Sequence, residues 1–406
     1  MSADRKLKLG VIGIGNMGSG HLLNVANGLC PSVEITAVCD IREERLAVAE
    51  KLQPGAAQFT DALELMDSGL AEAVLIATPH YLHPVYAKEA FSRGLHVLTE
   101  KPAGVTTAAV REMNAAAEAS GKKFAIMFNQ RTNPLFIRAH DLIQNGELGE
   151  LKRFVWIVTN WYRTQAYYDS GSWRATWNGE GGGVLLNQAP HNLDLWQWMF
   201  GVPDAVSAVI GFGKYHHIPV DDDATIIGEY KNGAVATFIT TTGECPGTNR
   251  LEISGDRGKI VLENGTLKWW KLKTPEREVC FSAKEGFYAG ETEYEEFSAE
   301  EPDGHPILLQ DFAEAVLLDR APRVPGFEGI RSLSISNAAY LSAWTGEKIV
   351  PGTQEERFKA LLSELQKKEQ EGEKRPAAGK EADKEGQTAP KSEDLNELMK
   401  RWQVRW

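Results

Sequence analysis

A glycine-rich hexapeptide near the start of the chain has the spacing of a phosphate-binding loop. Residues 13–18 read Gly-Ile-Gly-Asn-Met-Gly and stand between an apolar stretch and a helical one. Gly13 permits a tight turn, Gly15 lets the backbone approach a pyrophosphate, and Gly18 lets helix and strand pack closely. The helix that follows supplies free N–H groups and a partial positive charge. We therefore expect a dinucleotide to bind here.

A carboxylate further along the chain indicates which dinucleotide is bound. Asp40 ends the second β-branched stretch, about 20 residues after the loop, where it can hydrogen-bond the ribose hydroxyls and repel a 2′-phosphate. This position favours NAD over NADP. Arg42 stands two residues later and could tolerate the phosphate, so NADP remains the weaker alternative.

The glycine loop requires a parallel sheet around it, and the first third of the chain predicts one. Short apolar stretches alternate with helical stretches, some of which end at glycine. The expected strands are Lys6–Ile12, Val33–Cys39, Ala73–Ala77, His96–Thr99 and Phe124–Phe128. Such alternation is typical of a parallel sheet with helices on both faces. Residues 1–128 are therefore predicted to form an α/β Rossmann domain.

After about residue 130 the pattern changes to short β-rich runs separated by hairpin signals such as Lys231-Asn232-Gly233. Helical stretches at Ile307–Leu318 and Gly329–Thr345 close this region. We predict that residues 129–352 form an α+β domain with a large open, mostly antiparallel sheet, which binds substrate. Its own helices cover one face, so the other face predicts a homodimer or homotetramer.

Residues 353–406 are predicted to be a charged, disordered tail that ends in a short amphipathic helix. From about Gln366 to Lys391 the chain has almost no large apolar residues and cannot offset its conformational entropy. An apolar stripe returns over Ser392–Trp402. This stripe indicates either a docking helix or a weak helix without a docking site.

The overall charge and the cysteine pattern exclude several classes of function. A net charge of −12 disfavours nucleic acid and anionic membrane surfaces as partners. No apolar run approaches the roughly 18 residues of a membrane span, and the N-terminal residues do not resemble a signal peptide. The four cysteines lack metal-ligand spacing, which favours reduced thiols. A cytoplasmic protein is expected.

Two histidines close to three aspartates raise the question of a metal site. His216-His217 precedes Asp221-Asp222-Asp223 by a few residues. The spacing matches no established ligand pattern, so we expect a solvated loop and no metal.

Two further segments carry residues that could perform chemistry. Thr99-Glu100-Lys101-Pro102 follows a predicted strand, and Gly181 to Asp194 reads Gly-Gly-Gly-Val-Leu-Leu-Asn-Gln-Ala-Pro-His-Asn-Leu-Asp. Together with the glycine loop and Ile76-Ala77-Thr78-Pro79, these segments resemble the glucose–fructose oxidoreductase/inositol dehydrogenase (Gfo/Idh/MocA) family over roughly residues 6–352. The resemblance implies an NAD-dependent oxidoreductase that exchanges hydride with a hydroxyl carbon of a sugar, glucoside or inositol-like polyol.

The resemblance also implies that Lys101 and His191 act at the substrate hydroxyl. Oxidation of a secondary alcohol requires loss of the hydroxyl proton as hydride leaves, and a neutral imidazole suits that role. A lysine ammonium stabilises the developing alkoxide. The family usually has aspartate where this chain has Asn187, and an amide cannot take a proton. We predict His191 as general base, Lys101 as electrostatic partner, and Asn187 as a residue that orients substrate.

The remaining site predictions fall into two groups. The predicted cofactor-binding residues lie in the glycine loop and after the strands that follow it: Gly13, Gly15, Asn16, Met17, Gly18, Asp40, Arg42, Thr78, Pro79, His83, Glu100 and Lys101. The predicted substrate-binding residues come from an aromatic stretch with arginines and from the glycine-to-histidine segment: Tyr162, Arg163, Trp173, Arg174, Asn187, Gln188 and His191. Aromatic faces can cover a pyranose ring while Arg and Tyr bind its hydroxyls, although packing between domains explains the same composition equally well. Asp194 is expected to be structural.

Two other functions stay open. Bound NAD could oxidise a glycoside transiently, acidify the neighbouring C–H and allow elimination of the aglycone. Alternatively, the chain could be a non-catalytic protein that senses NAD or sugar, although Lys101 and His191 speak against it.

Overall fold

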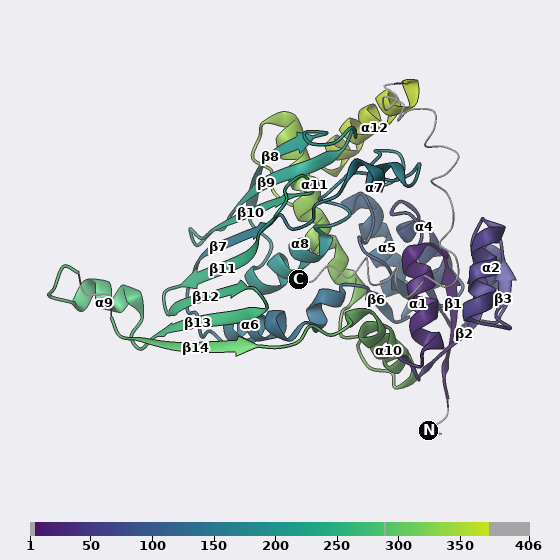
Figure 1. Cartoon of the computed structure of the whole chain (residues 1–406), viewed down its shortest axis with the longest axis horizontal. Helices are drawn as coiled ribbons and strands as arrows, with labels where there is room; N and C mark the ends of the chain where they lie inside the picture. The colour runs from purple at the N-terminus through teal and green to yellow at the C-terminus, as the bar shows by residue number, and fades with distance from the viewer. Residues whose placement is uncertain (1–4, 288–289, 373–406) are drawn as a thin grey trace.

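Two sheets organise the chain, one at each end of the molecule, with helices packed between them and around them (Figure 1). The structure is a computed structural model that describes residues 5–287 and 290–372. The predicted amphipathic helix at Ser392–Trp402 lies outside the described residues.

The first sheet has six parallel strands in the order β3-β2-β1-β4-β5-β6. Its strands are β1 (Leu7–Ile12), β2 (Val33–Cys39), β3 (Ala57–Phe59), β4 (Ala73–Ile76), β5 (His96–Thr99) and β6 (Phe124–Ile126). Its helices are α1 (Asn16–Ala26), α2 (Glu43–Leu52), α3 (Ala62–Asp67), α4 (Leu82–Ser92) and α5 (Thr107–Ser120). The strand order reverses between β1 and β4, and such a switch point is where open α/β sheets bind ligands. The predicted Rossmann arrangement is confirmed.

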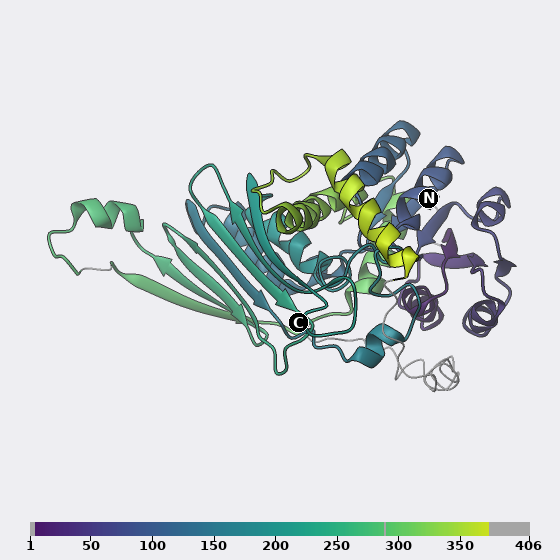
Figure 2. The same ribbon diagram turned by 90° about the horizontal axis from the view of Figure 1, so that it is seen from above.

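The second sheet has eight strands in the order β14-β13-β12-β11-β7-β10-β9-β8, and all pairs but β7–β10 are antiparallel. Its strands are β7 (Leu151–Val158), β8 (Ala205–Phe212), β9 (Asp221–Glu229), β10 (Val235–Thr241), β11 (Asn249–Gly255), β12 (Gly258–Glu263), β13 (Thr266–Leu272) and β14 (Thr292–Ser298). The predicted open, mostly antiparallel sheet is therefore confirmed. The short helix α9 (Glu276–Ser282) lies at the far end of the β13–β14 hairpin (Figures 1 and 2).

Helices α6 (Pro134–Gln144), α8 (Pro190–Phe200) and α11 (Gly329–Thr345) lie between the second sheet and the first one (Figures 1 and 2). An aromatic core joins α8 to the sheet. The Trp196 ring of α8 stacks on Phe154 of β7 at 5.5 Å and on Phe238 of β10 at 6.1 Å between ring centroids. Large buried aromatic pairs of this kind add to the free energy of burial. This packing fixes the position of α8, whose first turn carries His191.

The opposite face of the second sheet exposes apolar side chains. Val209, Ile227 and Val235 share one face by strand register, and they are 77%, 42% and 40% exposed. Their neighbours in the strands, such as Phe238, point to the other face and are buried. No helix of the described residues has the length and apolar character required to cross a membrane.

Helix α10 (Gly304–Leu317), which was expected to close the second domain, packs on Asn129–Thr132 shortly after β6. It also packs on α1 and on strands β1 and β5 of the first sheet. Gln310 of α10 hydrogen-bonds Ser32, and Pro325 pairs with Ala125 beside β6. The chain therefore returns to the nucleotide-binding sheet before α11.

The expectation of a disordered tail from residue 353 is also wrong over its first part. Residues Glu355–Glu371 form helix α12, which buries Phe358 and Leu362. The Phe358 ring stacks on Trp344 of α11 at 5.4 Å. In α12 a few apolar side chains recur at helical spacing among many charged ones. They form a stripe that packs on α11.

Candidate active site

The glycine loop has the geometry of a dinucleotide cradle. Gly13 has φ +91°, and a Cβ there would lie 2.6 Å from the backbone oxygen of Ala77. A Cβ at Gly18 would lie 1.9 Å from the Gly13 oxygen, so both positions require glycine. Gly15 faces open space, with no atom within 4 Å of a Cβ built there, and α1 begins at the next residue. The loop therefore leaves room for a pyrophosphate at a helix N-terminus, the arrangement that NAD requires.

Asp40 ties the end of β2 to this loop. Its Oδ2 accepts a hydrogen bond from Ile14 N at 2.8 Å, and Oδ1 accepts one from Arg42 N at 3.0 Å. The Arg42 side chain is 56% exposed, and its Nε lies 3.8 Å from Asp40. Arg45, which the sequence analysis did not single out, donates to the Ile14 oxygen and to Ser19. The carboxylate thus stands beside the loop with two arginines near it.

The segment after β4 contributes a buried hydroxyl. Thr78 Oγ1 is inaccessible and has no hydrogen-bond partner among the described residues. A buried polar atom without a partner costs free energy, so a bound ligand that completes its hydrogen bonding fits this position. Pro79 follows directly and begins the turn into α4. The residues present therefore fit NAD at the carboxyl edge of the first sheet.

His83 lies in this region but faces the backbone. Its Nδ1 is 2.7 Å from the Pro102 oxygen, and its Nε2 is 2.8 Å from the Thr78 oxygen. Burial lowers the pKa of the imidazole. His83 therefore joins the turns after β4 and β5, and the structure gives it the position of a structural residue.

Lys101 brings together the two segments that were predicted to be catalytic. It follows β5, and its Nζ donates a hydrogen bond to the backbone oxygen of Asn187 at 2.9 Å, across 86 residues of sequence. Burial lowers the pKa of the ammonium, while the carboxylates of Glu100 and Glu180 raise it. Glu100 itself is buried against His21 of α1.

His191 lies in the first turn of α8, directly after Pro190. The imidazole is 8% exposed, and its ring packs edge-on against Phe128 at 6.2 Å. Burial lowers the pKa well below 6.5, and the charges of Lys101 and His305 act in the same direction. Burial therefore favours the neutral form of the ring.

A carboxylate holds the turn that contains Gly183, the last of the three glycines before this helix. Asp221 of β9 accepts hydrogen bonds from Gly183 N at 2.6 Å and Leu185 N at 2.8 Å, and also from the Tyr340 hydroxyl at 2.5 Å. A Cβ at Gly183 would lie 1.9 Å from the Asp221 oxygen. Asp221 therefore fixes the turn that presents Asn187 and His191.

The expectation of a solvated loop around these aspartates is wrong. Asp221 and Asp222 are both fully buried. Asp222 accepts from the backbone N–H groups of Lys214, Tyr215 and His216, and its Oδ2 lies 2.9 Å from Nδ1 of His216. Within the described ranges no cluster of three or more potential ligands could hold a metal ion.

Four of the predicted substrate residues, Arg163, Trp173, Arg174 and Gln188, gather around Tyr167. Its hydroxyl accepts from Arg174 at 2.7 Å and from Gln188 at 3.2 Å. The guanidinium groups of Arg163 and Arg174 lie over its ring, at 5.1 and 4.5 Å from the centroid. The Arg174 guanidinium also lies over the Trp173 ring. The cluster offers aromatic faces and hydrogen-bond donors beside Lys101, whose pKa the two arginines lower.

Three further positions complete the description of the site. Tyr162, predicted to bind substrate, is 47% exposed, and its backbone oxygen accepts a hydrogen bond from Arg163 Nη1 at 3.0 Å. His80 is buried, and its Nδ1 lies 2.9 Å from the backbone oxygen of Glu180. Glu180 is 1% exposed and contacts Asn187. Its place directly before three glycines was the only sequence signal for it.

Asp194, expected to be structural, lies in a buried hydrogen-bond network. Both of its carboxylate oxygens accept from Arg131, each at 2.7 Å, and Arg131 also binds Glu328 at 2.6 Å. Gln197 donates to the same carboxylate. This buried network joins α8 to the segment that follows β6.

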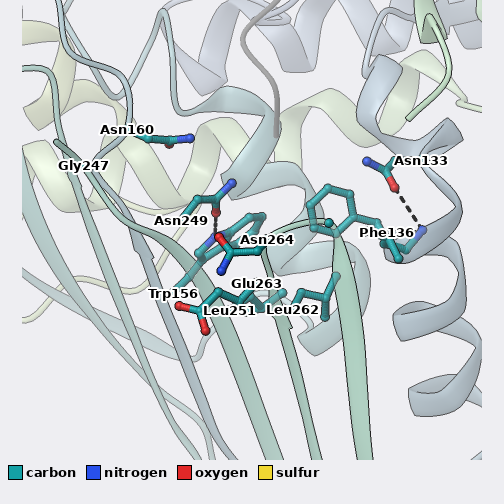
Figure 3. A pocket seen from close by; sticks show the side chains of 12 residues that line it. Asn133, Phe136, Trp156, Asn160, Gly247, Asn249, Leu251, Leu262, Glu263 and Asn264 are labelled. Atoms are coloured by element: carbon teal, nitrogen blue, oxygen red, sulfur yellow. Dashed lines mark hydrogen bonds between the residues drawn. The ribbon is translucent and has the colours of Figure 1, made fainter. Parts of the chain in front are cut away.

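A cavity of about 200 Å³ opens elsewhere, between the N-terminal end of α6 and the second sheet (Figure 3). Amide side chains line it, but structural hydrogen bonds occupy two of them. Asn133 accepts from Leu135 N, and Asn249 accepts from Trp156 Nε1 at 3.0 Å. Glu263 is paired with Arg250. None of the predicted site residues lines this cavity.

Comparisons with known proteins agree with this geometry. Residues 7–128 match the family model described as "Oxidoreductase family, NAD-binding Rossmann fold", and residues 140–350 match "Oxidoreductase family, C-terminal alpha/beta domain". The uncharacterized oxidoreductase YrbE of Bacillus subtilis is 23% identical over 348 residues, which cover 83% of this chain and 94% of that protein.

Two relatives have names that indicate a substrate. Inositol 2-dehydrogenase of Salmonella typhimurium is 33% identical over 146 residues, 36% of this chain and 43% of that protein. The solved WlbA dehydrogenase from Bordetella pertussis, in complex with NADH and UDP-GlcNAcA, is 26% identical with a TM-score of 0.71. That match covers 86% of this chain and 99% of the other.

Proposed function

The chain belongs to the Gfo/Idh/MocA oxidoreductase family, with its NAD-binding Rossmann fold, and from that premise we propose its reaction. It transfers hydride between a secondary hydroxyl carbon of a sugar, glucoside or inositol-like polyol and the nicotinamide of NAD. The observation that carries this proposal is the hydrogen bond from Lys101 Nζ to the Asn187 oxygen. That bond joins the carboxyl edge of the nucleotide-binding sheet to the segment that ends in His191.

Bound NAD supplies the hydride acceptor, and the residues of the chain handle the proton and the charge. His191, neutral because it is buried, accepts the hydroxyl proton as general base. Lys101 places its ammonium beside the oxygen and stabilises the developing alkoxide. Asn187 hydrogen-bonds the substrate and fixes which hydroxyl reacts. Burial of these groups strengthens each electrostatic interaction.

The proposed substrate class rests on two kinds of support. The Tyr167 cluster combines aromatic faces with two guanidinium groups, which suits a polyhydroxylated ring. In addition, the WlbA dehydrogenase binds a nucleotide-linked sugar acid, and inositol 2-dehydrogenase is named for a cyclic polyol. We include Arg163, Trp173, Arg174 and Gln188 in the proposed substrate pocket.

To test the proposal, the purified protein is mixed with glucosides, inositols and free sugars, with and without added NAD. The absorbance of reduced nicotinamide is then followed over time. Continuous NADH formation that requires added NAD is the expected result. A rise limited to about one equivalent, or release of an aglycone without a rise, would instead indicate retained cofactor and the elimination cycle. Binding of NAD and sugar with no turnover of any kind would overturn the proposal.

We also propose that the exposed face of the second sheet forms the interface of a homodimer or homotetramer. Val209, Ile227 and Val235 give that face its apolar character. Sedimentation of the protein and of Ile227→Lys tests this. A wild-type monomer would contradict it, and a dimer that the substitution dissociates would support it.

A further inference from the structure

Glu180 is a buried carboxylate in the candidate active site that the proposed reaction does not yet use. It directly precedes the glycines of the turn, and 1% of its surface is exposed. One carboxylate oxygen, Oε2, accepts from Ala175 N at 2.7 Å. The other, Oε1, accepts a hydrogen bond from Nδ2 of the Asn187 side chain. The carboxylate thus binds the side chain of a predicted site residue directly.

This contact determines how the Asn187 amide is oriented. An ionised carboxylate can only accept hydrogen bonds, so it binds the NH₂ end of an amide and not the carbonyl end. Asn187 Nδ2 therefore points toward Glu180, and Oδ1 points away from it. Among the described residues Oδ1 has no hydrogen-bond partner. It is left as an acceptor for a ligand.

The position of Lys101 indicates what this acceptor would meet. Its Nζ binds the backbone oxygen of Asn187, so the ammonium and the amide belong to the same small region. An ammonium donates and cannot accept, whereas Asn187 Oδ1 accepts. A sugar hydroxyl suits this position, because it can donate to Asn187 Oδ1, and the Lys101 ammonium has three N–H donors for neighbouring substrate oxygens.

The partners of Glu180 favour its ionised state at neutral pH. Burial, the largest effect, raises the pKa of its carboxyl above 4.5, while Arg174, the Ala175 and Asn187 hydrogen bonds and Lys101 oppose that rise. Both oxygens meet N–H donors, whereas a protonated carboxyl would need an acceptor for its O–H. In return, the carboxylate raises the pKa of Lys101 against the effect of burial. The negative charge of Glu180 therefore helps to keep Lys101 positive.

We propose that Glu180 is a positioning residue: it holds the Asn187 amide so that Oδ1 accepts a hydrogen bond from a substrate hydroxyl next to the reacting one, whose own proton goes to His191, and its charge sustains the Lys101 ammonium. Asn187 Oδ1 is then the hydrogen-bond acceptor, and the negative charge of Glu180 lies at the other end of the same amide. This inference rests on the proposed function, the oxidation of a secondary hydroxyl. It adds Glu180 as the residue that orients the Asn187 amide to accept a hydrogen bond from a hydroxyl.

The test exchanges the carboxylate and the amide between the two positions. Glu180→Gln keeps the shape of the side chain but removes its negative charge. The amides at positions 180 and 187 can then each rotate so that oxygen and nitrogen exchange places. We expect kcat/KM to fall about 10- to 100-fold, the loss typical of a hydrogen bond to a charged group. Asn187→Asp alone brings two carboxylates into contact, so one must take up a proton and the pH profile of kcat/KM gains an ionisation.

The double variant Glu180→Gln with Asn187→Asp restores one carboxylate and one amide in contact. The introduced carboxylate would accept from the new amide through one oxygen and from the hydroxyl through the other, so we expect recovery to within about tenfold of wild type. If Glu180 serves only to hold the backbone at Ala175, the losses in kcat/KM of the two single variants will instead add in the double variant. Additive losses, or a Glu180→Gln variant as active as wild type, would overturn the inference.

Unfolding temperature and NAD affinity of every variant separate this role from a general loss of structure. Glu147→Gln, which removes a partly exposed partner of Lys271 in the second sheet, is the matched control. If Glu180→Gln does not fold, Asn187→Leu tests the same contact from the other side, with the same expected loss in kcat/KM. A wild-type protein without turnover contradicts the proposed function, whereas active wild type with additive losses contradicts only the role of Glu180.

Discussion

His21 of α1 and Glu100 after β5 are joined by a buried hydrogen bond, with Nε2 of the imidazole 2.8 Å from Oε1 of the carboxylate. The two side chains are 1% and 5% exposed. His21 lies on the helix that follows the glycine loop, and Glu100 directly precedes Lys101. The contact therefore links the nucleotide cradle to the residue that reaches the proposed substrate site.

We predict that His21→Leu destabilises the protein by about 3 kcal/mol at neutral pH, because Glu100 would remain buried without its partner. Burial alone raises the Glu100 pKa, but the bond and charge of His21, with His305 and Lys101, lower it to about 2. A lowered carboxyl pKa contributes stability above the ordinary value of 4.5 that is lost as pH falls toward 2.

Urea unfolding of wild type and His21→Leu at pH 7, 5 and 4 measures this effect. The difference in unfolding free energy should hold between pH 7 and 5 and shrink below about pH 4.5. Lys88→Met, which breaks the exposed contact with Glu112, serves as control and should change stability by less than about 1 kcal/mol. A difference that grows as pH falls would contradict this account.

Asp40→Asn should weaken the preference for NAD over NADP. The amide can still accept from Ile14 N, so the loop keeps its hydrogen bond while the charge that repels a 2′-phosphate is lost. Arg42 and Arg45 then stand near the phosphate position. We expect the ratio of kcat/KM for NAD to that for NADP to fall about tenfold or more, the effect of about 1.4 kcal/mol. Arg42→Ala added to Asp40→Asn should reverse part of the gain in kcat/KM for NADP. If Asp40→Asn leaves the NAD-to-NADP ratio unchanged, Asp40 does not select the cofactor.

The parts of the fold that follow from local patterns could be predicted from the sequence. The glycine loop works through backbone shape, and only glycine fits where a Cβ would strike the backbone, as at Gly18. The inner strands of the first sheet are buried on both faces and read as short apolar runs; all four residues of β4 are buried. The edge strand β3, in which no residue is fully buried, was not predicted. Lys101 and His191 were placed by the resemblance of whole segments and not by spacing, because 90 positions separate them.

The parts that depend on tertiary contacts could not be predicted. Three consecutive aspartates look solvated in a sequence, but Asp221 and Asp222 are buried because folded loops present N–H groups to them. Glu180 looks like a loop residue until the turn brings Asn187 back to it. The charge-rich composition after residue 353 hid the buried Phe358 and Leu362 of α12.

The lowered pKa of His191 predicts how kcat/KM for oxidation depends on pH. Burial, then Lys101 and His305, lower this pKa, while Glu100 raises it. A histidine with a pKa near 6.5 would lose its function as a base below that pH, whereas a neutral buried ring keeps it. We expect kcat/KM for oxidation to show no inflection near pH 6.5, and His191→Asn to reduce it about 10²- to 10⁴-fold at each pH. A wild-type inflection at 6.5 that disappears in His191→Asn would contradict the structure.

Helix α12 clamps the loop that carries the proposed substrate residues. The Glu369 carboxylate accepts from Trp177 N at 2.9 Å and from Asn178 N at 2.8 Å. Gln366 donates to the hydroxyl of Tyr81, which in turn donates to the Trp177 oxygen. The clamped residues lie immediately before Glu180, so α12 holds one end of the segment that positions Asn187.

We predict that Glu369→Ala raises KM for the sugar about tenfold, because two or three hydrogen bonds to a charged group hold the loop and their loss increases its motion. NAD affinity should stay within about twofold of wild type, since Asp40 and the glycine loop lie elsewhere. Glu356→Ala on the same helix, where the side chain is 87% exposed, is the matched control. Limited proteolysis should cut the Glu369→Ala loop between residues 170 and 180 faster than that of the control. Equal KM values and equal cleavage in the two variants would show that α12 does not position the substrate loop.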